Sequence, residues 1–395
     1  MATDKIVQFP DAARASSAGR RLIPRRLTDA RLVKQMSQTD LAQKIGVTRQ
    51  AVSAYERGGK LPEPQTMGKI SEILEQPIYY FTGDDLPTFG EGTPRFFRAF
   101  GPKTKKRNLM CDVLGDWFVQ IGKYVEGYVN LPDVDIPAIT PTGPEGRYTD
   151  EEIEQAAEMV RSHWGLGVGP ISNTVALLES KGIFIARCPV GGQQVEAFSF
   201  WNGEQPFIFL ASNKDAAVRS RFDVAHELGH LVLHQGVGLE EIEDSRQLKV
   251  IEAEANRFAG AFLLPRASFP NEVYTPRLDA FRDLKARWKV SIQVMVYRCK
   301  NLEIFDEDQV TNLYKQISFR KWRKSEPLDD YFSFEEPKLL KKAVTLVLQH
   351  GKVAADRLPI ELRLNSSLVE KICNLPEGSL QTDAIISPTP TLKVE

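Results

Sequence analysis

Apolar residues in the segment "SQTDLAQKIGVTRQAVSAYERG", residues 37–58, recur with the spacing of two short helices. Ser37 and Thr48 each precede one helical pattern and are residue types suited to cap the helix that follows. Gly46 lies between the two patterns, where a residue without a Cβ can adopt a positive φ angle and turn the chain. The residues expected to face inward are Leu41, Ala42, Ile45, Val52 and Tyr55. A helix, a glycine turn and a second helix in this order predict a helix-turn-helix.

Farther along, helical patterns alternate with apolar runs and proline-rich sequence. A helical stretch is expected around Leu109–Tyr128. The segment "NLPDVDIPAITPTGPEG" follows, and its repeated prolines are incompatible with regular structure. Thr149 then caps a helix with an acidic first turn. The segments "VEAFSFW" and "PFIFLA" alternate or run apolar as strands do. Further helices are expected around Ile251–Leu264, Leu278–Lys300 and Pro337–His350. The pattern predicts a mainly α protein with a small β-sheet, an α+β fold.

These changes of pattern divide the chain into five parts. They are a flexible basic arm (1–25), a helix-turn-helix domain (26–83), a linker helix with a proline-rich linker (84–147), a domain containing the strands and most histidines (148–326), and a helical C-terminal extension with a disordered tail (327–395). The first 60 residues carry 12 Lys and Arg against 5 Asp and Glu, a net charge of +7 in a chain of net charge -1. Such a bias is typical of a module that binds a polyanion, and a solvated charged surface is the simpler alternative.

Composition narrows the class of protein. Of 395 residues, 42% are hydrophobic and 26% are charged, as in an ordinary globular protein. The four cysteines are far apart and form no CxxC pair, which favours neither a disulfide framework nor a thiolate metal site and fits a reducing compartment. No apolar run approaches the roughly 20 residues that cross a bilayer, and the N-terminus lacks the apolar core of a secretion signal. We expect a cytoplasmic protein with no membrane partner.

Three of the five histidines lie within residues 221–256. His226 and His230 are four residues apart, so on a helix both imidazoles project from one face and can reach one metal ion. Glu227 lies beside them, where its carboxylate can meet a water at the metal. Gly229 indicates a place where a side chain would not fit, because of close packing or because the metal needs room. The residues that back this face are Val224, Ala225, Leu228 and Val232. The pattern favours a metal site over a histidine pair satisfied inside a polar core.

A catalytic zinc ion usually has three protein ligands and a water, so a third ligand is needed. His234 follows His230 by only four residues on the same helix, without an intervening turn, and we interpret it as a supporting or packing residue. The acidic helix "IEAEANRFAGAFLLP" carries Glu252 and Glu254 on opposite flanks of its apolar face. Periodicity does not choose between these two glutamates.

The segments "RFDVAHELGHLVLH", "EAEANRFAGAFLLP" and "RWKVSIQVMVYRCKNLEIFD" resemble the ImmA/IrrE metallo-endopeptidases, here joined to an N-terminal segment that resembles the XRE, or lambda-repressor-like, helix-turn-helix. The peptidase resemblance covers roughly Thr149–Pro327. It implies a zincin-like metallopeptidase domain that binds Zn²⁺, with Mn²⁺ as the alternative. The family's "EAN" pattern falls on Glu254. The resemblance therefore implies His226, His230 and Glu254 as ligands, and Glu227 as the general base.

In lambda-repressor-like modules the second helix lies in the major groove of double-stranded DNA, and its first residues touch base edges. The residues in these positions are Thr48, Arg49, Gln50 and Ser53. Gln38, at the start of the preceding helix, is placed to contact a phosphate or to support the recognition helix. Arginine can read guanine and glutamine can read adenine, so a DNA operator is the predicted partner. A helical protein-interaction module is the alternative.

Together these features predict a DNA-binding transcriptional regulator with zinc-dependent endopeptidase activity. The resemblance implies a protein substrate, either a helix-turn-helix repressor or an antitoxin-like protein, in the control of stress, phage or mobile-element genes. The fusion of both parts in one chain adds the chain itself, cut in its proline-rich linker, as a further substrate. Repressors of this class commonly bind two-fold DNA sites as homodimers. Two alternatives are a transcription factor whose peptidase-like domain senses a ligand or metal without proteolysis, and an antitoxin-like binding module. The intact HExxH motif favours the enzyme.

Overall fold

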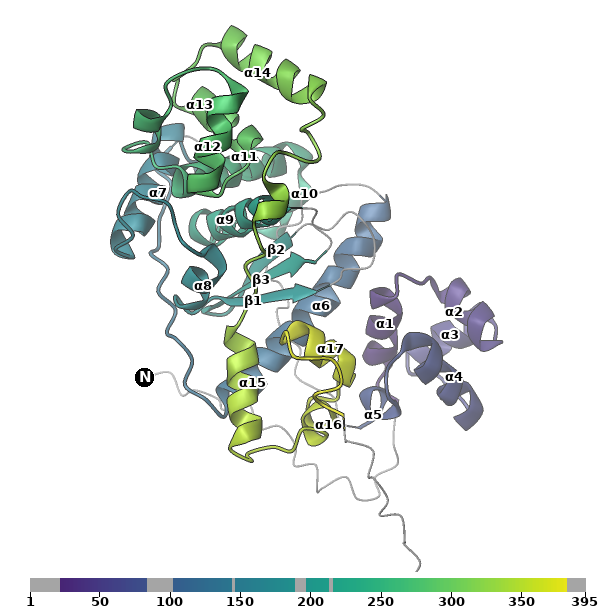
Figure 1. Ribbon diagram of the computed structural model, residues 1–395. Coiled ribbons are helices and arrows are strands. Elements are labelled where there is room, and N and C mark those ends of the chain that lie inside the picture. The colour runs from purple at the N-terminus through teal and green to yellow at the C-terminus, as the bar shows by residue number, and fades with distance from the viewer. Residues whose placement is uncertain (1–21, 84–101, 144–145, 189–196, 213–215, 382–395) are drawn as a thin grey trace, which may run out of the picture. The chain divides into compact units, whose positions relative to one another are not determined.

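In a computed structural model of the chain (Figure 1), the described residues are 22–83, 102–143, 146–188, 197–212 and 216–381. They form two compact units. The first unit contains residues 22–83, 102–129 and 340–381, and the second contains the described residues between 130 and 339. No described helix is both long enough and apolar enough to cross a membrane.

The first unit is all-helical in its described part. Its helices are α1 (Pro24–Val33), α2 (Gln38–Ile45), α3 (Arg49–Glu56), α4 (Pro64–Leu74), α5 (Ile78–Phe81), α6 (Pro102–Glu126), α15 (Leu339–Gln349), α16 (Arg357–Leu362) and α17 (Ser366–Ile372). Ser37 caps α2 in a capping box with Asp40, and Thr48 caps α3. Gly46 has a φ angle of 76° at the turn between these helices. The five residues expected to face inward are all buried, which confirms the helix-turn-helix.

The first unit begins earlier than the sequence indicated. Helix α1 starts at Pro24, within the segment predicted to be a flexible arm. Arg26 is buried, its guanidinium lies 4.7 Å from the centre of the Tyr80 ring, and its Nη1 donates to the carbonyl of Arg363. Leu22 and Ile23, within the predicted arm, are also buried, and the N–H of Ile23 donates to the carbonyl of Phe81 over 2.8 Å. The arm prediction is therefore wrong from Leu22 onward. The rest of the predicted arm, residues 1–21, lies outside the described residues.

The C-terminal extension is built into the first unit. Gln120 of α6 donates to the carbonyl of Leu362 over 2.5 Å, and the Tyr79 hydroxyl donates to the carbonyl of Leu364 over 3.2 Å. Asn365 caps α17 and donates its side-chain amide to the carbonyl of Glu75. These bonds join residues more than 200 positions apart, which local patterns cannot reveal. The predicted disordered tail, residues 382–395, lies outside the described residues.

The second unit places a small sheet beside a group of helices (Figure 1). Its elements are α7 (Asp150–His163), α8 (Thr174–Glu179), β1 (Phe184–Cys188), β2 (Ala197–Asn202), β3 (Gln205–Ala211), α9 (Ala217–Leu233), α10 (Leu239–Glu243), α11 (Ser245–Leu263), η3 (Phe269–Glu272), α12 (Leu278–Trp288), α13 (Ile292–Asn301), α14 (Glu307–Phe319) and η4 (Asp329–Tyr331). The strand order is β1-β3-β2, with β3 parallel to β1 and antiparallel to β2. The mainly α fold with a small sheet is confirmed. The one helix expected at Leu278–Lys300 is instead two, because the chain turns at Lys289 with a φ angle of 54°.

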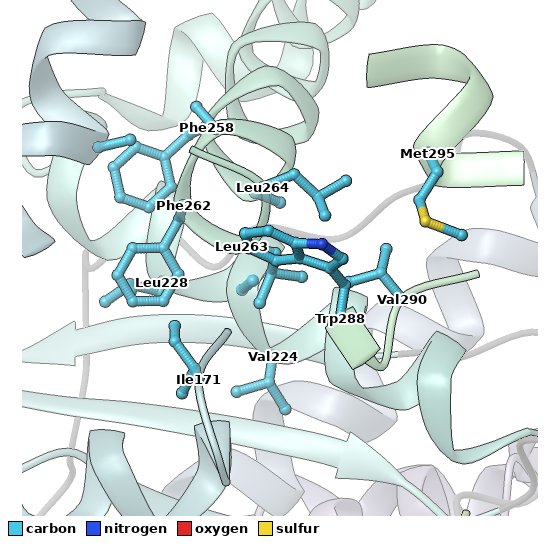
Figure 2. Close-up of a cluster of buried hydrophobic side chains, with 14 of the residues drawn as sticks. Ile171, Val224, Leu228, Phe258, Phe262, Leu263, Leu264, Trp288, Val290 and Met295 are labelled. Atoms are coloured by element: carbon cyan, nitrogen blue, oxygen red, sulfur yellow. The ribbon is translucent and has the colours of Figure 1, made fainter. Parts of the chain in front are cut away.

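The hydrophobic core of the second unit lies between the sheet and helices α7, α9, α11, α12 and α13, and Figure 2 labels ten of its side chains. Leu228 of α9 and Phe258 and Phe262 of α11 belong to this core. A Cβ atom added to Gly229 would lie 3.2 Å from the Cα atom and the carbonyl oxygen of Ala255. A larger residue at position 229 would therefore prevent the close packing of α9 against α11. These two helices carry the candidate metal ligands, and the close packing keeps them in contact.

Candidate metal centre

Helix α9 presents three polar side chains from within a buried environment. His226, Glu227 and His230 are each at most 2% exposed, and the four residues predicted to back them are buried in the core. The Nε2 atoms of His226 and His230 lie 3.0 Å apart, as the spacing of one helical turn predicts. Apolar packing behind the helix thus holds both imidazoles on one polar face.

Glu252 of α11 completes this group. Its carboxylate oxygens lie 3.4 Å from the Nε2 atom of His226 and 3.4 Å from the Nε2 atom of His230. Among the described residues, one donor atom from each of these three side chains lies within 4.8 Å of the other two. A tetrahedral zinc ion with bonds of about 2.0–2.1 Å places its donors roughly 3.3 Å apart. Two imidazoles and a carboxylate with this spacing fit Zn²⁺ and leave a fourth position for another ligand.

The charge of Glu252 is stabilised where it lies. Burial alone would raise the pKa of Glu252, but hydrogen bonding and charge interactions with His226 and His230 outweigh that effect. The net result holds its pKa well below the ordinary range for a glutamate. The group is therefore an anionic donor at neutral pH, which is the form that binds a cation.

Glu254, the ligand implied by the family resemblance, faces elsewhere. Its Oε1 accepts a hydrogen bond from the backbone N–H of Tyr148 over 3.0 Å, and its Oε2 lies 2.9 Å from the Nε2 atom of His234. Residues two apart on a helix are separated by about 200° around its axis, so only one of the two glutamates can face the histidine pair. The structure brings Glu252 to that pair, and the third-ligand prediction is revised accordingly.

His234 lies behind His230. It occupies the C-cap position of α9, and its Nδ1 is 3.0 Å from the Nδ1 of His230. Complete burial lowers the pKa of His234 to about 4, although the neighbouring Glu254 acts in the opposite direction. His234 therefore has the supporting position that the sequence indicated.

Two further side chains hold the site and were not predicted. The Nδ1 of His226 lies 3.1 Å from the Oδ1 of Asn256, and the Ser199 hydroxyl donates to the Oε2 of Glu227 over 2.7 Å. Asn256 follows Glu252 by four residues, so helical spacing could have placed it on the same face. Nothing in the sequence around Ser199, on β2, distinguishes it from other strand residues.

An apolar strand that precedes a metal-binding helix, as "PFIFLA" does, can lie in the core or can pair with an extended substrate by β-addition. This segment forms β3, which hydrogen-bonds to β1 on one side and to β2 on the other. All of Pro206–Ala211 is buried. The core interpretation is therefore confirmed.

The predicted DNA-contacting residues lie around the start of α3. Thr48, Arg49 and Gln50 are exposed, and Ser53 is half-buried. Gln38 donates to a carboxylate oxygen of Glu56 over 2.8 Å, and the same carboxylate pairs with the guanidinium of Arg31. Gln38 thus braces the end of α3, which is the supporting one of its two predicted roles.

Comparisons with known proteins match both parts of the chain. Residues 178–300 match the family model described as IrrE N-terminal-like domain, and residues 28–81 match the model described as Helix-turn-helix. The chain is 37% identical over 75 residues to "Uncharacterized HTH-type transcriptional regulator y4aM" of Sinorhizobium fredii (strain NBRC 101917 / NGR234), a match that covers 18% of this chain and 52% of that protein.

The chain is also 39% identical over 54 residues to "Uncharacterized HTH-type transcriptional regulator YqaE" of Bacillus subtilis (strain 168). This match covers 14% of this chain and 47% of that protein. The chain thus spans about half the length of the curated relatives it matches. The segment matched by the IrrE model contains all the residues of the candidate metal centre. The chain therefore combines a segment that matches the Helix-turn-helix model with a segment that matches the IrrE N-terminal-like domain model.

Proposed function

We propose that this chain is a DNA-binding transcriptional regulator that contains a zinc-dependent endopeptidase. The observation that carries the peptidase is the convergence of His226, His230 and Glu252. Glu227 follows His226 on α9, and the Ser199 hydroxyl holds its carboxylate. Two neutral nitrogen donors, one anionic oxygen donor and an adjacent carboxylate base are the parts that hydrolytic zinc sites share.

When bound, Zn²⁺ would supply Lewis-acid polarisation of a peptide carbonyl and make water acidic enough to lose a proton near neutral pH. Glu227 would accept the proton of the attacking water and deliver it to the amine nitrogen as the C–N bond breaks. The Ser199 hydroxyl binds one oxygen of this carboxylate and restricts its rotation. The apolar packing around α9 keeps bulk water from the rear of the site.

For the substrate, we propose a separate protein, a helix-turn-helix repressor or an antitoxin-like protein. Self-cleavage in the proline-rich segment 130–143 is disfavoured, because that segment is bonded into the second unit. Asp135 donates its N–H to the carbonyl of Lys181 and accepts a bond from the indole of Trp164 over 2.7 Å. The Tyr148 hydroxyl donates to the carbonyl of Ile139. An extended substrate conformation at the metal would require these bonds to break.

For the DNA-binding part, α3 provides the proposed recognition helix. Thr48, Arg49 and Gln50 are exposed at its first turn, while the far end is braced by Gln38 and Glu56. Both curated relatives are named as helix-turn-helix transcriptional regulators, and the proposal extends that role to this chain. A homodimer on a two-fold operator is the assembly that we propose, because a helix-turn-helix monomer reads only half a site.

The decisive experiment compares the full-length wild-type protein with Glu227→Gln. Bound zinc is measured by elemental analysis, and each protein is incubated with helix-turn-helix and antitoxin-like proteins encoded beside its gene, with and without DNA. We expect one zinc per chain in both proteins and cleavage only by the wild type. Glu240→Gln, at an exposed glutamate of α10, is the matched control and should cut as the wild type does. Zinc binding without cleavage by the wild type would reject the peptidase and favour a metal sensor.

A further inference from the structure

A line of hydrogen bonds runs from the backbone of Tyr148 to His230. The N–H of Tyr148 lies 3.0 Å from the Oε1 of Glu254, the Oε2 of Glu254 lies 2.9 Å from the Nε2 of His234, and the Nδ1 of His234 lies 3.0 Å from the Nδ1 of His230. The three side chains are each at most 4% exposed. Water therefore does not compete for these groups, and each bond must have one donor and one acceptor.

The ionised carboxylate of Glu254 has no proton to donate, and this fixes the direction of every bond in the line. An N–H can only donate, so Glu254 accepts from Tyr148, and as a carboxylate it also accepts from His234. His234 then carries its proton on Nε2, and in a neutral imidazole this leaves a lone pair on Nδ1. That lone pair requires a proton on the Nδ1 of His230, which leaves the Nε2 of His230 as a lone-pair donor. This Nε2 is the atom that faces His226 and Glu252.

We propose that Glu254 and His234 are positioning residues that set the tautomer and the orientation of His230 for metal binding. Glu254 acts on the metal through two histidines and does not bind it. The inference rests on the proposed metal centre but not on peptidase activity. His226 is positioned by a single side chain. Its Nδ1 faces the amide oxygen of Asn256, which favours a proton on Nδ1 and a lone pair on Nε2, the tautomer inferred for His230.

The first test needs no substitution. Long-range ¹H–¹⁵N correlation spectra of the zinc-loaded full-length protein report which nitrogen of each histidine carries the proton. We expect His234 to be protonated on Nε2 only, and His230 to be protonated on Nδ1 with Nε2 bound to zinc. A proton on the Nδ1 of His234 would overturn the proposal, because that nitrogen could not then accept from His230.

The second test measures Zn²⁺ affinity by competition with a chelator. A glutamine amide at position 234 can accept from His230 with its oxygen and donate to Glu254 with its nitrogen. We therefore expect His234→Gln to retain most of the affinity, whereas His234→Leu, of similar volume, should bind Zn²⁺ about 10- to 100-fold more weakly. Equal affinities for the two variants would contradict the positioning role, and circular dichroism checks that both fold.

Cobalt spectroscopy separates Glu254 from Glu252. With Co²⁺ as the probe, Glu254→Ala should weaken binding while the visible spectrum keeps the shape seen for the wild type, because the ligands are unchanged. Glu252→Ala should alter the spectrum itself, since it removes a ligand. The opposite result would make Glu254 the ligand and overturn the inference. If the wild type binds no metal at all, the proposed metal centre and this inference both fail; if it binds metal without cleaving, only the peptidase proposal fails.

Discussion

The Ser199 hydroxyl on β2 donates a hydrogen bond of 2.7 Å to the Oε2 of Glu227 on α9. A strand of the sheet therefore contacts the proposed general base directly, through the completely buried side chain of Ser199. A carboxylate that is anchored at one oxygen has fewer rotamers available, so the position of its proton-accepting oxygen is better defined.

Ser199→Ala should therefore slow catalysis without removing the metal. A hydrogen bond to a charged group contributes about 1.5–3 kcal/mol, which corresponds to a fall in kcat of roughly 10- to 150-fold if it is fully expressed in the transition state. The measurement is kcat on a cleaved partner together with zinc content. Ser162→Ala, at an exposed position of α7, is the control. An unchanged kcat in Ser199→Ala would show that the bond does not position Glu227.

Removal of zinc should destabilise the second unit, because the three proposed ligands come from two helices. His226 and His230 lie on α9, and Glu252 lies on α11. A ligand present at 100 times its Kd stabilises the folded state by about 2.7 kcal/mol. We expect a chelator to lower the Tm of the wild type by more than it lowers that of Glu252→Ala, which keeps only two of the three ligands. Equal shifts in both proteins would mean that the ion does not bridge the helices through Glu252.

Gly229 should not tolerate a larger side chain. Because an added Cβ would already lie 3.2 Å from backbone atoms of Ala255, Gly229→Val should force α9 away from α11 and lower the free energy of unfolding by about 1–3 kcal/mol. Gly68 on α4 offers the contrast, since nothing lies within 4 Å of its added Cβ. Gly68→Ala should stabilise its helix by up to about 1 kcal/mol. Denaturant unfolding measures both, and a neutral Gly229→Val would refute the packing explanation.

The features fixed by local chemistry were predictable from the sequence. Ser37, Gly46 and Thr48 are capping and turn residues, and a four-residue spacing is enough to place His226 and His230 on one face. These features depend on a few neighbouring residues, whose preferences are the same in any fold.

The choice between Glu252 and Glu254 depended on the rotation of α11 about its own axis relative to α9. The two helices approach closely at Gly229 and Ala255, and sequence periodicity contains no information about how they pack. The same limit applies to Ser199 and to the bond between Arg26 and Arg363, which join segments far apart in the chain. Such pairings arise only when the whole core is assembled.

Arg49→Ala should weaken specific DNA binding. A bidentate contact between an arginine and a base contributes about 1–3 kcal/mol of discrimination, or roughly 5- to 150-fold. The operator is first selected from random DNA with the wild-type protein, and affinities are then measured on that sequence and on unrelated DNA. Arg246→Ala, at a side chain of α11 that is 92% exposed, removes the same charge outside the helix-turn-helix and should bind as the wild type does. Equal loss in both variants would indicate a general charge effect rather than base recognition.

The most direct test of the metal centre is a crystal structure of the zinc-loaded protein with anomalous diffraction recorded on both sides of the zinc absorption edge. We predict one strong anomalous peak bound by the Nε2 atoms of His226 and His230 and by the carboxylate of Glu252, with Glu227 beside the fourth position. The absence of zinc from this site, or a zinc ion bound by Glu254 in place of Glu252, would contradict the account.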